Sequence, residues 1–169
     1  MLRRVFIPEN EGRHEVAGRA CGQCTACCTI MGVCELNKAN YQPCSHECGC
    51  CAIYNSRPNT CRTWSCVWLL GRLEGDERRR PDQLGLMFNH EKLAGQPITV
   101  AYEVWAGAGR QSNNKYLLRK MSLKMPIVLR EYQTRKCDVI TPDRKKRQLI
   151  RQSIQDDWYR TKSQSPFMS

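Results

Sequence analysis

The pattern of hydrophobic and polar positions is clearest in the second half of the chain. Residues 98–105 are rich in β-branched and aromatic side chains with partial alternation, which predicts a strand that ends at the glycines of 107–109. Two shorter apolar runs, 126–129 and 137–140, predict two more strands. Residues 112–124 have helical spacing instead, with an apolar stripe formed by Leu117, Leu118 and Met121.

A second helix is expected near the C-terminus. Thr141-Pro142-Asp143 is a favourable helix start, with the threonine as cap and the proline in the first turn. The helix that follows places three apolar residues four positions apart on one face: Ile150, Ile154 and Trp158.

The first half of the chain has a different pattern. A short strand is expected at 5–7, and residues 71–97 form a charged connector with an exposed loop at 74–81 and a short strand at 84–88. Residues 21–70, the cysteine block, are rich in turn formers and have no long periodic run. Such a segment buries too little apolar surface to order itself, and metal ligation would supply the missing folding energy.

These elements predict an α+β fold, in which a small, irregular, metal-stabilised cysteine-rich segment packs on a short body of strands and helices. With 169 residues, the chain has the size of one compact domain. Within it we distinguish residues 1–97, with the N-terminal strand, the cysteine block and the charged connector, from a basic α+β part, residues 98–169.

Charge is distributed unevenly between these two parts. Residues 1–97 contain 12 Lys and Arg against 10 Asp and Glu, whereas residues 98–169 contain 15 against 6. A basic surplus of this kind suits an anionic partner such as RNA or DNA, with 144–147 (Arg-Lys-Lys-Arg) as its densest run. The alternative is an ordinary solvated helix face, and the sequence leaves both open.

Cysteine is the outlier of the composition. The chain has 12 cysteines, eleven of them between Cys21 and Cys66, and Cys137 stands alone. Disulfides would require an exported protein, but the N-terminus has no apolar segment typical of a signal peptide, so we expect a cytoplasmic protein. No stretch approaches the roughly 18 apolar residues of a membrane span, and we expect no membrane partner. Clustered thiols in a reducing compartment indicate metal binding or catalysis.

The cysteine spacing favours a shared metal. In Cys21-Gly-Gln-Cys24-Thr-Ala-Cys27-Cys28, two intervening residues let both sulfurs of each C-x-x-C pair reach one ion across a tight turn. In an iron–sulfur site the same turn directs backbone N–H groups at the sulfurs. A second group between Cys44 and Cys66 brings the total above what one four-coordinate zinc ion can use. Two zinc sites or one iron–sulfur cluster would fit.

The motif resembles the CxxCxxCC family, also called YkgJ-like cysteine cluster proteins, which are described as zinc- or iron-chelating domains. The resemblance covers about 50 residues. It comprises Cys21-x-x-Cys24-x-x-Cys27-Cys28, then Cys44, then Cys51-Ala-Ile-Tyr-Asn-Ser-Arg57-Pro58-Asn-Thr-Cys61-Arg62-Thr-Trp64-Ser-Cys66. It implies metal binding through eight thiolates: Cys21, Cys24, Cys27, Cys28, Cys44, Cys51, Cys61 and Cys66. Larger enzymes similar in this block, such as flagellin lysine methylases, use it to hold an iron–sulfur cluster.

Several residues near the motif have two interpretations. Arg57 and Arg62 would either compensate the negative charge of a thiolate site or only shape a turn. His46 is a candidate nitrogen ligand or an ordinary loop residue. Trp64 and Trp68 would shield the site or join the core. Cys34, Cys48 and Cys50 are extra to the pattern, and Cys137 is expected to be a small buried apolar residue.

The sequence therefore predicts a metal-binding protein that holds zinc or an iron–sulfur cluster, with a structural or metal-handling role. Two alternatives remain: an iron–sulfur-dependent redox or peptide-modifying enzyme, and a basic nucleic-acid-binding protein with a structural metal site. An unidentified protein partner is compatible with all three. No nucleophile elbow, phosphate-binding loop or dinucleotide fingerprint is present, so the enzyme class stays open.

Overall fold

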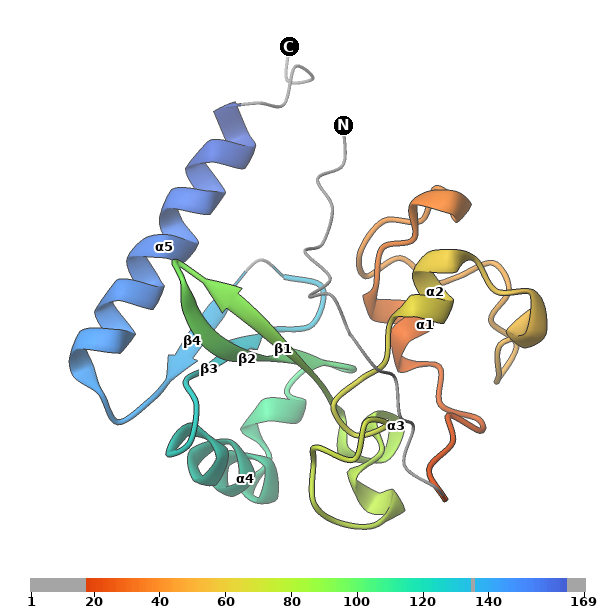
Figure 1. Cartoon of the computed structure of the whole chain (residues 1–169), viewed down its shortest axis with the longest axis horizontal. Coiled ribbons are helices and arrows are strands. Elements are labelled where there is room, and N and C mark those ends of the chain that lie inside the picture. Colours follow the sequence, from red (N-terminus) through yellow and green to blue (C-terminus); the bar gives the residue numbers. More distant parts are fainter. Residues whose placement is uncertain (1–17, 135, 164–169) are drawn as a thin grey trace.

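A four-stranded mixed sheet organises the second half of the molecule (Figure 1). The structure, a computed structural model, describes residues 18–134 and 136–163, with the backbone alone over 157–163. The strands follow the order β1-β2-β3-β4, and the pairs β1–β2 and β3–β4 are antiparallel while β2–β3 is parallel. Their bounds are β1 Leu86–Leu93, β2 Gln96–Glu103, β3 Ile127–Arg130 and β4 Cys137–Ile140.

The helices connect and cover these strands. Of the predicted elements, the strand at 137–140 and the helix near 112–124 are confirmed, as is the α+β class. The strand expected at 5–7 lies outside the described residues. The α-helices are α1 Ala26–Ile30, α2 Asn59–Thr63, α3 Pro81–Leu84, α4 Ser112–Ser122 and α5 Arg144–Ser163, and the 3-10 turns are η1 Cys34–Leu36, η2 Tyr54–Ser56, η3 Glu77–Arg79 and η4 Ala108–Arg110.

The strand predicted at 84–88 begins later and runs further. Gly85, at φ 77°, ends α3 in the left-handed conformation, so extended backbone starts only at Leu86. The strand then continues into a tight hairpin, in which Ala94 and Gly95 have φ values of 49° and 74°. Positive φ at both turn residues matches the twist of paired strands.

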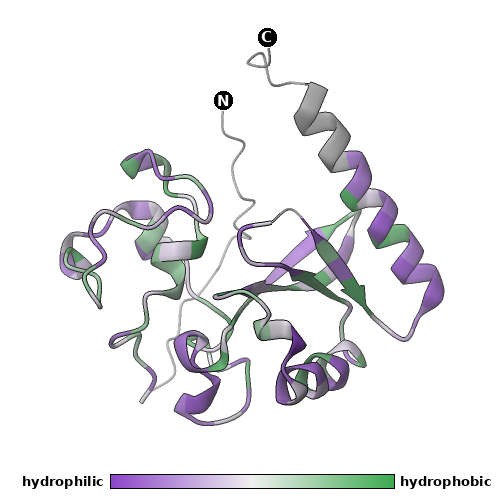
Figure 2. Cartoon of the chain, turned by 180° about the vertical axis from the view of Figure 1, so that it is seen from behind, coloured by the Kyte–Doolittle hydropathy of each residue, from purple (hydrophilic) through white to green (hydrophobic). Residues whose placement is uncertain are grey.

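Side chains alternate across β2 and β3 and create two apolar layers. Ala101 and Leu129 belong to a first core, which also contains Leu117 and Leu118 of α4. The residues facing the other way form a second core with α5: Ile98, Val100, Val128, Val139 and Ile150. The sheet is therefore sandwiched between α4 and α5, and Figure 2 shows the apolar strands beneath a hydrophilic outer helix surface. We call residues 86–163 the sheet body.

The start of α5 differs from the prediction in its cap. The carboxylate of Asp143 accepts hydrogen bonds from the backbone N–H groups of Lys145 and Lys146, at 2.9 and 3.0 Å, and the helix begins at Arg144. Thr141 instead accepts from the N–H of Asp143. Asp143, and not Thr141, thus caps the helix, because its carboxylate is the group that reaches the free N–H groups of the first turn. Ile150 and Ile154 face the second core as expected, and the Trp158 side chain lies outside the description.

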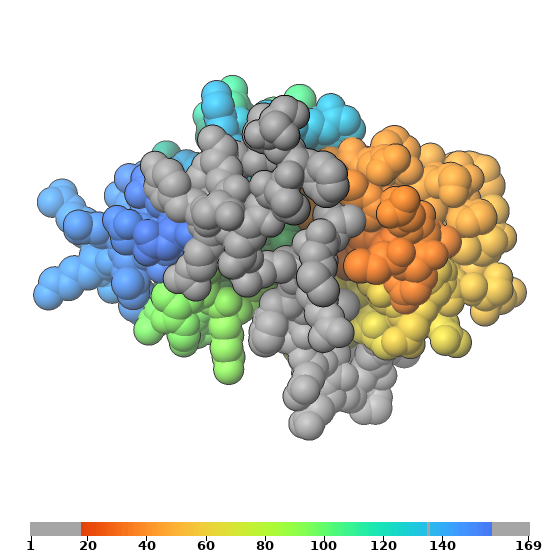
Figure 3. Space-filling view, turned by 90° about the horizontal axis from the view of Figure 1, so that it is seen from above, coloured from red at the N-terminus to blue at the C-terminus, as the bar shows by residue number. Residues whose placement is uncertain are grey.

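The cysteine block packs against the end of the sheet where β1 begins (Figure 1). Val67 N–H donates to the carbonyl of Phe88 at 3.0 Å, and Ala26, Ile30 and Cys66 join the first core. One apolar core thus spans both parts, and the boundary drawn after residue 97 falls within β2. Figure 3 shows α5 and the cysteine block on opposite sides of the molecule. In the part of the chain that is described, no helix is long and apolar enough to cross a membrane.

Candidate metal centre

A single cavity in the cysteine block is lined by eight cysteines. They are the same eight that the motif singles out: Cys21, Cys24, Cys27, Cys28, Cys44, Cys51, Cys61 and Cys66. The cavity volume is about 90 Å³, far below the ~300–1,000 Å³ typical of organic-ligand sites. The space suits ions and sulfur atoms, and apolar side chains such as Met31, Leu69 and Met87 complete its walls.

Within the described residues, no three side chains of His, Cys, Asp or Glu are arranged closely enough to hold a metal ion. The thiols share the walls of the cavity without converging on a common point. To bind a metal ion, the cysteine side chains must therefore rotate so that their sulfurs, which already line one cavity, point to a common position.

The first four cysteines are positioned by a turn and a short helix. Cys24 N–H donates to the carbonyl of Cys21 at 2.8 Å, and Gly22 occupies the left-handed region at φ 53°, which favours glycine. Helix α1 then carries Cys27 and Cys28. The sequence predicted this tight turn from the C-x-x-C spacing.

The other four reach the cavity from separate loops. Cys44 N–H donates to the carbonyl of Cys28 at 3.1 Å, which attaches its loop to α1. Helix α2 carries Cys61, and its start is fixed by Glu35, whose carboxylate accepts from the N–H and the hydroxyl of Thr60 at 3.0 and 2.7 Å. These contacts close the cavity across the block.

The thiols divide into two sets by their electrostatic interactions, with the Cys27–Cys28 contact between the sets. In the first set, Cys24 interacts electrostatically with Cys66, and Cys66 with Cys21. Cys27 interacts with both Cys21 and Cys24. The first set is therefore Cys21, Cys24, Cys27 and Cys66.

The second set is connected in the same way. Cys61 interacts with Cys28, Cys44 and Cys51. Cys51 in turn interacts with Cys28 and Cys44, and the thiols of Cys28 and Cys51 are hydrogen-bonded. The second set is therefore Cys28, Cys44, Cys51 and Cys61, and each set contains the four ligands of a tetrahedral thiolate site.

The adjacent residues Cys27 and Cys28 join the two sets. Their thiols share a hydrogen bond, which lowers the pKa of Cys28 to about 7 and raises the pKa of Cys27. Lys38 also lowers the pKa of Cys28, against the effect of burial. Cys28 is thus the thiol of this pair that ionises first, and its thiolate is the form that binds metal.

Backbone N–H groups point at several of the sulfurs. Cys24 and Cys51 each accept from the N–H two residues further along the chain, and Cys66 accepts from those of Leu69 and Trp68. Burial raises the pKa of all three thiols, that of Cys24 to about 12, and these hydrogen bonds act in the opposite direction. N–H donors aimed at sulfur stabilise thiolate, and of these three thiols only Cys24 lies in the C-x-x-C run for which the sequence predicted them.

Lys38 is a buried cation that the sequence analysis did not single out. Only 6% of it is exposed, and its ammonium group donates to the carbonyls of Thr29, Met31 and Ala39. Burial lowers its pKa, while nearby thiols, first Cys44, act to raise it. Lys38 lies in a loop without helical or strand periodicity, so no pattern in the sequence predicted that it would be buried.

A second cation lies beside the first set. Arg80 pairs with Asp82 at 2.6 Å, and Asp82 contacts the Cys24 thiol. Burial opposes ionisation of Asp82, but hydrogen bonds from Arg80, Gln83 and Cys24 outweigh it and lower the pKa to about 2. The sequence analysis noted Arg80-Pro81-Asp82 only for its resemblance to extended family members and assigned residues 74–81 to an exposed loop, so it predicted no contact with the thiols.

The two interpretations of Arg57 both receive support. Its guanidinium donates to the carbonyl of Tyr54 at 2.8 Å and lies over the Tyr54 ring at 3.6 Å, which shapes the turn. Burial raises the pKa of Cys51, and the charge of Arg57 acts against that rise. Arg62 is exposed and lines the cavity. Trp64 lines the cavity, whereas Trp68 is buried in the first core.

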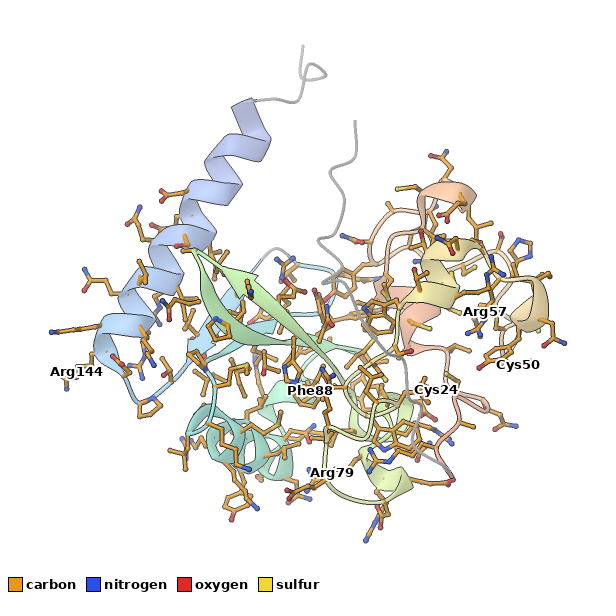
Figure 4. All side chains as sticks on the ribbon, viewed as in Figure 1. Cys24, Cys50, Arg57, Arg79, Phe88 and Arg144 are labelled. Carbon is orange, nitrogen blue, oxygen red and sulfur yellow. The ribbon has the colours of Figure 1, made fainter. Side chains whose placement is uncertain are left out.

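The remaining thiols and histidine lie elsewhere. Among the described residues that line the cavity, none is Cys34, Cys48, Cys50 or His46. Cys34, Cys48 and Cys50 are exposed, and Figure 4 shows Cys50 at the outer edge of the block, farther from the sheet than Cys24. Cys137 is half-buried against the second core and does not line the cavity.

The basic run 144–147 opens α5. Arg144, Lys145 and Lys146 are exposed, whereas Arg147 donates to the carbonyl of Thr141. In Figure 4, Arg144 and Arg57 lie on opposite sides of the molecule. The cationic surface and the thiols are therefore separate features.

A scan of protein-family models, a search of curated proteins and a search of solved structures each find no match to this chain. The resemblance to the CxxCxxCC family remains a prediction from the quoted motif. The case for a metal centre therefore depends on the chemistry of the residues themselves.

Proposed function

We propose that this protein binds metal through the eight cavity thiols, as two adjacent four-thiolate sites that hold zinc or iron–sulfur centres. The observation that carries the proposal is the shared cavity: eight of the eleven cysteines in the block line it. Thiolates are preferred ligands of zinc and of iron–sulfur centres, and eight thiols at one small cavity supply the ligands of two four-thiolate sites.

The division into two sets supports two centres. Four thiolates on one zinc ion carry a net charge of −2, and a partly buried dianion requires compensation. Lys38 lies beside the second set, where its charge favours the thiolates. Beside the first set, Arg80 is paired with Asp82, so this pair adds no net positive charge.

The role that follows is structural or metal-handling. The block contains only short helices and two isolated bridges, so bound metal would connect α1, α2 and the loops that carry Cys44 and Cys51. Metal binding would then be coupled to folding of the block.

Elemental analysis and a visible spectrum of protein prepared anaerobically test the proposal. Stoichiometric zinc with a colourless protein identifies zinc, and iron with sulfide and absorbance near about 400 nm identifies an iron–sulfur centre. Protein that contains neither metal as isolated, and takes up neither after reduction and reconstitution, would overturn it. Metal content of Cys137→Ser serves as a control, because this thiol lies outside the cavity.

A further inference from the structure

Two thiols outside the cavity stand together at the tip of a small hairpin. Cys48-Gly49-Cys50 forms this tip, and Gly49 adopts φ 81°. Glu47 pairs with Cys51 as an antiparallel bridge, and Cys48 N–H donates to the carbonyl of Cys50 at 3.0 Å. The hairpin is therefore a closed turn that holds both cysteines on one short segment.

The separation of the two sulfurs matches a shared metal ion. Cys48 Sγ and Cys50 Sγ lie 3.9 Å apart, and both residues are exposed. Two thiolates bonded to one tetrahedral ion at about 2.3 Å are about 3.8 Å apart, whereas a disulfide bond measures about 2.04 Å. The pair can bind one thiophilic ion with little movement, while a disulfide would require the sulfurs to approach by almost half their distance.

The surroundings of the pair favour a cation. The Glu47 carboxylate accepts the Gly49 N–H at 2.8 Å, so a negative charge is fixed at the tip. A cation held by the two thiolates would gain from this charge, and the exposed position lets it exchange with solvent.

The base of the hairpin leads directly into the cavity. Cys51, which follows Cys50, belongs to the second thiol set, and Glu47 N–H donates to the carbonyl of Cys44 in the same set at 3.1 Å. Figure 4 shows Cys50 at the outside of the block, while the cavity thiols lie within it. The exposed pair and the half-buried set are thus consecutive along one hairpin.

We propose that Cys48 and Cys50 acquire a thiophilic metal ion from solution and transfer it to the second thiol set. The transfer step rests on the proposed function of the cavity. Binding releases the two thiol protons to solvent. In the transfer, thiolates of the second set replace Cys48 and Cys50 on the ion one at a time, and the freed sulfurs take up protons again. No electron changes hands, so no oxidant or reductant is required.

Zinc uptake by the reduced, metal-free full chain tests this inference. Zinc is presented as its complex with a chromogenic chelator, and its loss from the chelator is followed in time. We compare the wild type with Cys48→Ser/Cys50→Ser, and with Cys34→Ser as a matched control, since Cys34 is also exposed and outside the cavity. The double variant should load slower by about tenfold, because the pair holds zinc at a high effective concentration beside the cavity. Its final content of tightly held zinc should equal that of the wild type.

A second readout separates this inference from the proposed function. In excess zinc, the wild type and Cys34→Ser should hold one extra ion that the chelator removes first, and the double variant should lack it. If this labile ion is present only with the pair but the cavity holds none, the proposed function fails while the pair remains a metal site. If the cavity fills at the same rate in all three proteins and no labile ion depends on the pair, the inference is overturned. A double variant that loses tightly held zinc would overturn it too, because the pair would then be a permanent ligand.

Discussion

The sheet body and the cysteine block show two ways of holding a chain together. In the sheet body, strand pairing satisfies the backbone over eight registered pairs in β1–β2 alone, and apolar side chains fill two cores. In the block, the helices α1 and α2 have five residues each, and the only strand-like pairs among its described residues are two isolated bridges. Its thiols line a cavity, beside apolar side chains that join the first core.

The difference teaches where a ligand is needed. A sheet with apolar faces is stabilised by the burial of those faces. The hydrophobic free energy gained exceeds the conformational entropy lost when the strands become ordered. The cysteine block contributes fewer apolar side chains to a core, and under the proposed function the ions held by its thiols supply the rest of its order. The four predictions that follow test this contrast, from the largest expected effect to the smallest.

Removing the metal should give the largest effect. Metal chelation under reducing conditions is expected to raise amide exchange throughout the cysteine block, while amides of β2 and β3 keep their protection. Hydrogen exchange with and without metal measures both parts in one sample. Equal loss of protection in both would contradict the contrast, since it would show one cooperative unit held by metal.

Paired cysteine replacements should reveal the two sets. Cys24→Ser/Cys27→Ser removes two ligands from the first set alone, and we expect it to halve the metal content, because the second set keeps all four thiolates. Cys24→Ser/Cys61→Ser damages both sets and should reduce the content to nearly none. Metal analysis of the two doubles beside Cys137→Ser decides the question. Identical losses in both doubles would show a single centre that uses all eight thiols.

Truncating a buried side chain of the second core should lower the stability of the sheet body without changing the metal content of the cysteine block. Ile150 is 1% exposed, and Ile150→Ala is expected to lower the free energy of unfolding by about 2–5 kcal/mol. Metal content should not change, because Ile150 packs against β2, β3 and β4 and not against the block. Denaturant unfolding and metal analysis of the same preparation test both statements. Loss of metal on this substitution would show that the two parts depend on each other more than the contrast allows.

Acidification should weaken the sheet body slightly. Burial, and then Arg72, lower the pKa of His90, whose ring contacts the Thr99 hydroxyl at 3.2 Å. The unfolded chain therefore takes up the proton first, so the contribution of the neutral ring is complete above about pH 6.5 and decreases as the pH falls toward the lowered pKa. In His90→Gln, the decrease in stability between about pH 7 and pH 5 should become smaller. Denaturation midpoints across this range measure it, and an unchanged slope would contradict the assignment.

The sequence by itself determined the elements that depend on local pattern. Strand β4 was predicted to the residue, and helix α4 and the stripe of Leu117 and Leu118 follow from their spacing, because apolar periodicity specifies which face is buried. Spacing placed Cys21, Cys24, Cys27 and Cys28 at one turn, and the resemblance to the CxxCxxCC motif implied the same eight cysteines that line the cavity. The strand start at Leu86 and the cap at Asp143 were missed by a few residues, because each depends on one residue's backbone conformation or reach.

Only the tertiary structure decided how those cysteines divide and what surrounds them. Cys66 joins the Cys21 turn across a long stretch of chain, and Cys27 and Cys28 fall into different sets although they are neighbours. Lys38 and Arg80 reach the thiols from a loop and from the charged connector. Contacts between residues distant in the chain depend on how α1, α2 and the sheet pack, and no local pattern records that packing.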